Sequence, residues 1–150
     1  MGKLTLAQAI QTAIDAERSA VKFYSRLARN TNNSDARQLL QDLCKDEQKH
    51  EERLLELAQD IGNIALPEVG MPLAESIETR RDYLDATDLT YEQSLEVALE
   101  GERNAMMLYD ALADGAPVAV QTFFRELSAV EGEHARKISS LLAEIRKAGK

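Results

Sequence analysis

The sequence predicts an all-α protein: a four-helix bundle with one long crossover between its second and third helices, built from two duplicated helix pairs. Three observations support this prediction. Ala, Leu, Glu, Lys and Arg are abundant, while the 150 residues include only seven Gly and three Pro, which favours helices. Apolar residues recur at helical spacing along four long segments. The second half of the chain repeats the pattern of the first half.

The four predicted helices begin at recognisable capping signals. The first and third start with a Thr and a Gln three residues apart, the pattern of a capping box, at Thr5 and Thr90. Either Asn33 or Ser34 is the expected N-cap of the second, and Pro117 suits the first turn of the fourth. The helices are expected to cover about residues 5–29, 35–61, 90–114 and 117–147.

The connections between these helices are unequal in length. Short loops are expected at 30–34 and 115–117, whereas residues 62–89 separate the second helix from the third. Within this long connection, the segment NIALPEVGMPL predicts irregular structure and LAESIETRRDYLDA predicts one short helix. Two short loops and one long crossover are the ferritin-like arrangement, in a single domain over residues 1–150. A bundle with short loops throughout does not fit this spacing.

The repeat is a duplicated helix pair. A shift of 85 residues places the first helix on the third, and a shift of 84 places the second on the fourth. Because the two halves repeat one pattern, we expect a pseudo-twofold axis between them. The repeat is too long, and its copies are too few, for a solenoid. The matched polar positions are Glu17 with Glu102, Tyr24 with Tyr109, Glu47 with Glu131 and His50 with His134.

Each helix carries one Glu inside its own apolar stripe, and the second and fourth add a His three residues later. This Glu-x-x-His spacing places both side chains on one helical face. Four buried carboxylates without Lys or Arg on the same stripes would repel one another and lose their hydration. Two divalent cations would neutralise them, and the oxygen-rich set favours iron or manganese, as a matched or a mixed pair. The competing interpretation is a bundle that keeps the pattern but no longer binds metal.

The motifs AERSAVKFY, EQKH, EGERNAMMLY and EGEH resemble those of the rubrerythrin branch of the ferritin-like superfamily, and the resemblance extends over all four helices. It implies that Glu47 and Glu131 bridge two iron ions. It also implies that each ion has one terminal Glu and one His, drawn from the set Glu17, Glu102, His50 and His134. Tyr24 and Tyr109 resemble tyrosines that bind ligating carboxylates and take part in catalysis, although ordinary core aromatics would show the same pattern.

Two features depart from that family. Rubrerythrin has a further Glu three residues after its third-helix ligand, which exchanges with a His when the iron changes oxidation state. Ala105 stands at this position, so the same movement is in question. Rubrerythrin also has a rubredoxin domain with four Cys ligands, whereas Cys44 is the single cysteine of this chain. Electrons for any reduction are therefore expected from a separate donor protein.

Composition narrows the partners and the compartment. A net charge of −8 disfavours nucleic acid. The absence of a long apolar run and of a basic, apolar leader disfavours a membrane partner and secretion. Together with the lone cysteine, this predicts a cytoplasmic protein. By resemblance, we also expect a homodimer, whose subunits could exchange helix pairs.

Three functions remain open at this point. The first is an oxidoreductase that acts on hydrogen peroxide or dioxygen at a di-iron site. The second is an iron-handling ferroxidase of the ferritin-like type. The third is a non-enzymatic bundle in which metal serves as a structural clamp.

Overall fold

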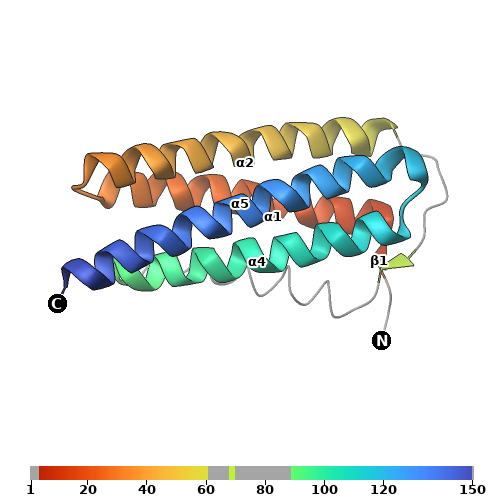
Figure 1. The fold of residues 1–150 in the computed structure, drawn as a ribbon. Coiled ribbons are helices and arrows are strands. Elements are labelled where there is room, and N and C mark those ends of the chain that lie inside the picture. The colour runs from red at the N-terminus through yellow and green to blue at the C-terminus, as the bar shows by residue number, and fades with distance from the viewer. Residues whose placement is uncertain (1–3, 61–67, 70–88, 150) are drawn as a thin grey trace.

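The computed structural model describes residues 4–60, 68–69 and 89–149, which form four long helices and one pair of short strands (Figure 1). The four helices run side by side. The two helices that each short loop joins are antiparallel to each other. This confirms the predicted all-α, ferritin-like four-helix bundle built from two helix pairs. The helices are α1 (Leu6–Asn30), α2 (Ser34–Asp60), α4 (Tyr91–Gly115) and α5 (Val118–Ala148).

The helix starts follow the capping signals closely. At α4, the hydroxyl of Thr90 accepts a hydrogen bond of 3.1 Å from the backbone of Gln93, whose side chain accepts one of 2.9 Å from Thr90 N. The predicted capping box is therefore formed. At α2, Asn33 rather than Ser34 is the cap, since its Oδ1 accepts a 3.0 Å bond from the backbone of Ala36. Both caps satisfy backbone N–H groups that the first turn of a helix leaves without partners.

The remaining boundaries depart slightly from the expectation. Pro117 lies at the N-cap of α5, one position before the first helical turn that the sequence suggested. Leu4–Thr5 (β1) pairs antiparallel with Glu68–Val69 (β2), a segment expected to be irregular. The side-chain contact expected of Thr5, the end of α2 at Ile61 and the short helix expected within residues 62–89 lie outside the described part of the chain.

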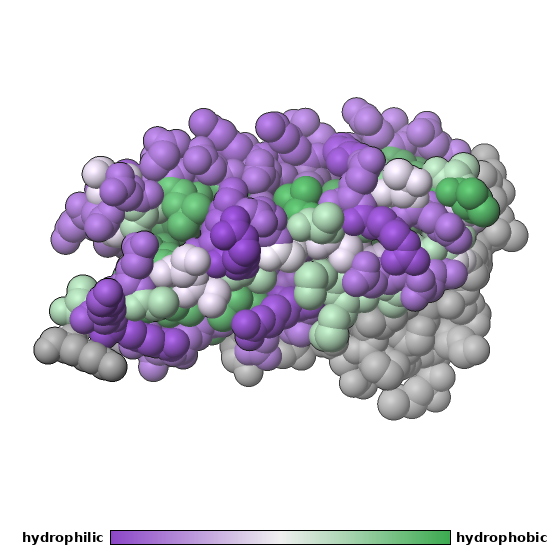
Figure 2. All heavy atoms as spheres, in the orientation of Figure 1, coloured by the Kyte–Doolittle hydropathy of each residue, from purple (hydrophilic) through white to green (hydrophobic). Residues whose placement is uncertain are grey.

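The apolar stripes of the four helices form a core in two parts. Figure 2 shows hydrophilic side chains along the outer side of α2 and hydrophobic ones in the seam between α2 and α5. One part surrounds Ile10, Ile14, Leu54, Leu112 and Phe124. The other surrounds Phe23, Leu40, Leu43, Leu95 and Ile138. A layer of buried polar side chains belongs to neither cluster. None of the described helices is long and apolar enough to span a membrane.

Matching contacts in the two halves make the duplication visible in three dimensions. The thiol of Cys44 donates to the carbonyl of Val21 at 3.4 Å, and the hydroxyl of Ser128 donates to the carbonyl of Met106 at 3.2 Å. The 84- and 85-residue shifts relate these two pairs to each other. Burial raises the pKa of the Cys44 thiol, which favours its protonated, less reactive form.

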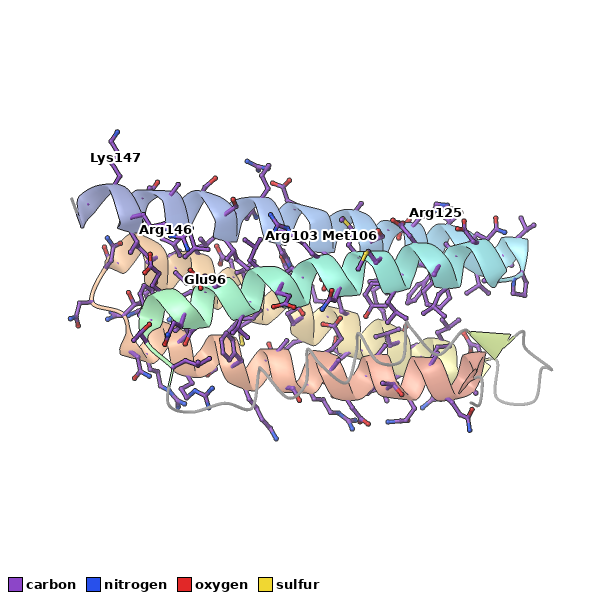
Figure 3. The ribbon with its side chains drawn as sticks, turned by 90° about the horizontal axis from the view of Figure 1, so that it is seen from below. Glu96, Arg103, Met106, Arg125, Arg146 and Lys147 are labelled. Atoms are coloured by element: carbon purple, nitrogen blue, oxygen red, sulfur yellow. The ribbon has the colours of Figure 1, made fainter. Side chains whose placement is uncertain are left out.

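Ion pairs on the surface join the two helices of a pair. Arg146 of α5 reaches both Glu92, at 2.9 Å, and Glu96 on α4, and Figure 3 shows Arg146 beside Glu96. All three side chains are about half exposed, so each contact adds little to the stability of the fold. The buried stripes and the polar layer between them therefore dominate the energetics of the bundle.

Candidate metal centre

The buried polar layer consists of four glutamates and two histidines, with every helix contributing. The exposed fraction is 0% for each glutamate, 4% for His50 and 1% for His134. Such burial is rare for ionisable side chains unless charge or hydrogen bonds compensate it. The six residues are Glu17 on α1, Glu47 and His50 on α2, Glu102 on α4, and Glu131 and His134 on α5. They are the six that the sequence predicted as ligands.

These side chains converge as two overlapping groups. In each group, one ligand atom from every residue lies within 4.8 Å of the corresponding atoms of the others. Glu47 and Glu131 belong to both groups, so they lie between the two halves of the centre. The first group is Glu17, Glu47, His50 and Glu131, and the second is Glu47, Glu102, Glu131 and His134.

The imidazole of His50 faces the first group through Nδ1. This atom lies 3.1 Å from Oε1 of Glu131, 3.6 Å from Oε1 of Glu47 and 3.8 Å from Oε2 of Glu17. None of these approaches has the geometry of a hydrogen bond, so the buried Nδ1 is not satisfied by protein atoms. A buried nitrogen in this situation needs an explanation, and a metal ion supplies one.

His134 repeats this geometry in the second group. Its Nδ1 lies 3.1 Å from Oε1 of Glu47 and 3.5 Å from both Oε2 of Glu102 and Oε1 of Glu131, again without hydrogen-bond geometry. The two imidazole rings are 6.0 Å apart between centroids and inclined by 22°. The pseudo-twofold relation inferred from the duplicated sequence therefore holds for the ligand atoms themselves.

Burial dominates the electrostatics of the centre. It raises the pKa of Glu47 well above its ordinary value, and the charges of the three neighbouring glutamates add to the effect. Burial lowers the pKa of His50, but the neighbouring carboxylates of Glu17 and Glu47 together outweigh this and the pKa is raised. The pKa of His134 is raised in the same way, chiefly through Glu102. The metal-free centre therefore retains protons, which a divalent cation would displace.

Two tyrosines complete the centre by crossing between the helix pairs. The hydroxyl of Tyr24 donates to Oε1 of Glu102 at 2.6 Å, and that of Tyr109 donates to Oε1 of Glu17 at 2.7 Å. Both tyrosines are 1% exposed. The sequence suggested that each would bind a carboxylate but did not indicate which one. Each bond reaches the glutamate of the opposite half.

The structure adds one residue that sequence reasoning missed. Nε2 of His134 lies 2.9 Å from Oδ2 of Asp46, the residue immediately before Glu47 on α2. Asp46 lies outside the apolar stripe of α2, and its side chain is 37% exposed. Its position in the sequence is therefore typical of a residue that faces solvent. The one signal in the sequence is its position next to a Glu-x-x-His motif, because a metal-binding His commonly donates its other N–H to a carboxylate.

The residues present fit a pair of divalent metal ions. Atoms bound at about 2.1 Å to one ion and at right angles to each other lie about 3 Å apart. The Nδ1–oxygen distances of 3.1 to 3.8 Å in both groups need only small adjustments to meet this value. Four carboxylates with two imidazoles suit iron or manganese rather than a softer metal.

Comparisons with known proteins agree with this geometry. A family model described as Rubrerythrin matches residues 2–58 and 93–150. A solved structure of a hypothetical protein from Pyrococcus furiosus is similar to this chain, with a TM-score of 0.74 and 20% identity over 93% of this chain and 89% of that one. At this identity the similarity supports the fold alone. No curated protein is similar enough in sequence to count as a match.

Proposed function

This chain belongs to the rubrerythrin family, and on that premise we propose that it is a di-iron oxidoreductase. It would reduce hydrogen peroxide or dioxygen with electrons from a separate donor protein. The observation that carries this proposal is the pair of ligand groups sharing Glu47 and Glu131. A centre with two shared carboxylates can hold two ions close together, and each ferrous ion could then supply one of the two electrons of a two-electron reduction.

The six buried side chains would divide into bridging and terminal ligands. Glu47 and Glu131 would bridge the ions, because their carboxylates lie in both groups. Glu17 and His50 would hold one ion, and the matched pair from the second half would hold the other. When bound, the iron pair would supply electrons and Lewis acidity by cycling between its ferrous and ferric states.

The protein's own contribution is to orient ligands and control protons. Tyr24 and Tyr109 hold the terminal carboxylates in place and keep a hydroxyl proton on each phenolic oxygen, 2.6 and 2.7 Å from a carboxylate oxygen. Each of these protons lies beside a terminal ligand on α1 or α4, and we propose that they assist the reduction. Reducing hydrogen peroxide to two waters consumes two electrons and two protons. The protons would pass through the layer of buried polar side chains, and the electrons would come from the donor protein.

The donor is inferred from the cysteine content. A rubredoxin-type iron site needs four cysteines, and this chain has one. The single cysteine is also compatible with two other functions. They are a ferroxidase, which takes its electrons from ferrous iron itself, and a bundle in which metal is purely structural.

Stopped-flow oxidation of the anaerobic, ferrous-loaded protein separates these functions. We expect faster oxidation by hydrogen peroxide than by dioxygen, and repeated turnover when a chemical reductant is supplied. Retention of tens of iron atoms per chain after aerobic loading would instead indicate iron handling. No redox change with either oxidant would leave only the structural role. Glu47→Ala, which removes a shared carboxylate, is the inactive control.

A further inference from the structure

The two halves of the metal centre match in their ligands but differ in what supports the histidines. Nε2 of His134 lies 2.9 Å from the carboxylate of Asp46. The 84-residue shift that relates α2 to α5 places Val130 at the position equivalent to Asp46. Within the described residues, every carboxylate contact of His50 is made through Nδ1. Among the described residues, the pseudo-twofold symmetry of the histidine contacts therefore breaks at the acceptor for Nε2.

We propose that Asp46 is a positioning residue that makes the two metal positions unequal, so that the position built on His134 binds the first ion. This inference rests on the proposed di-metal centre and concerns its internal order. Asp46 and Glu47 are neighbours on one turn of α2, and they contact opposite nitrogens of the same imidazole. The ring of His134 therefore lies between two consecutive carboxylates of one helical turn, and the one at Nε2 makes a hydrogen bond.

The physical basis of this inequality is the placement of the ring proton. A carboxylate at Nε2 keeps the proton on that nitrogen, so Nδ1, which faces the centre, is the nitrogen left to bind an ion. His134 therefore needs no change of tautomer or ring orientation to bind an ion. His50 has no such acceptor among the described residues. Its ring must therefore adopt the tautomer with the proton on Nε2 when it binds the metal. Loss of a supporting carboxylate of this kind typically weakens metal affinity by about 10- to 100-fold.

Titration of the metal-free protein with Zn²⁺ against a chromophoric chelator tests the proposal. We expect two binding steps whose dissociation constants differ by about tenfold or more. Asp46→Ala should weaken the tighter step by about 10- to 100-fold and bring the two steps together. Asp46→Asn should retain most of the affinity, because its amide oxygen still accepts from Nε2–H. Asp42→Ala is the matched control, since it removes an exposed acidic side chain one turn away on the same helix.

A second measurement reports on the ring itself. The chain has two histidines, so the imidazole region of a ¹⁵N NMR spectrum contains two sets of signals. With one equivalent of Zn²⁺, the signals of His134 should move first, and its Nε2–H should exchange with water more slowly than that of His50. Asp46→Ala should remove this protection while leaving the His50 signals in place. A purely structural role for Asp46 would not produce this selective loss.

The outcomes separate this inference from the proposed function. Two Zn²⁺ ions bound with equal affinity, or an Asp46→Ala variant with unchanged affinities, would overturn the inequality and leave the di-metal centre standing. Protein that binds no Zn²⁺ would contradict the centre itself, and the inference with it.

Discussion

The hydroxyl of Tyr24 on α1 donates a 2.6 Å hydrogen bond to the carboxylate of Glu102 on α4, so each helix pair supports a glutamate of the other. Tyr109 makes the reciprocal bond to Glu17 at 2.7 Å. These two bonds connect the halves of the bundle through the centre. The geometry of the terminal carboxylates therefore depends on how the two pairs are docked.

The first prediction concerns this crossed bond. Tyr24→Phe removes the hydroxyl that donates to Oε1 of Glu102 and should lower Zn²⁺ affinity by about 10-fold or more, because supporting hydrogen bonds orient ligating carboxylates. Competition with a chelator measures the change. Tyr91→Phe is a suitable control, since the Tyr91 hydroxyl makes no hydrogen bond within the described residues. Equal affinities for the two variants would contradict a supporting role for Tyr24.

The second prediction distinguishes shared from terminal ligands. Glu47→Ala should abolish binding of both ions, because its carboxylate belongs to both ligand groups, whereas Glu17→Ala should remove only one of them. Elemental analysis of protein loaded with excess metal and then desalted gives the stoichiometry. Glu100→Ala, an exposed change on α4, should bind like the unmodified chain. A Glu47→Ala protein that still holds two ions would refute the ligand assignment.

The third prediction concerns pH and follows from the raised pKa values. The folded, metal-free protein holds a proton on Glu47 above its ordinary pKa of 4.5, and on His50 above 6.5. Since the folded state binds more protons than the unfolded state, its free energy of unfolding decreases as pH rises through these raised values. The melting temperature of chelator-treated protein should therefore fall from about pH 5 to pH 8.

Metal should reverse this trend. Binding displaces the same protons, so the stabilisation by Zn²⁺ should grow as pH rises. Thermal melts with Zn²⁺ and with chelator, at matched pH values, measure the difference. If the metal-free protein became more stable with increasing pH, the centre would not be the proton-holding site that its burial implies.

The fourth prediction concerns helix capping. Thr90→Ala removes the side-chain acceptor of the α4 capping box and should lower the free energy of unfolding by about 1 kcal/mol. Urea denaturation of the metal-free protein measures this directly. Thr90→Ser keeps the hydroxyl and should restore most of the loss. An equal loss in both variants would show that the threonine methyl group, not the cap, stabilises the helix start.

The sequence by itself determined the helices, the duplication and the six convergent side chains. These features depend on contacts between residues three or four apart, which the period of the α-helix sets locally. Glu47 and His50 occupy one face wherever the helix is placed, and the repeat predicts the same for Glu131 and His134. A buried quartet of carboxylates then needs protons or cations to offset its charge, for purely electrostatic reasons.

Only the tertiary structure decided which partners meet across the bundle. Tyr24 reaches Glu102 over a separation of 78 residues, and Asp46 reaches His134 over 88. The pairing of β1 with β2 is likewise non-local. Such contacts depend on the rotation and axial offset of each helix relative to its neighbours, which side-chain packing sets and helical periodicity does not encode.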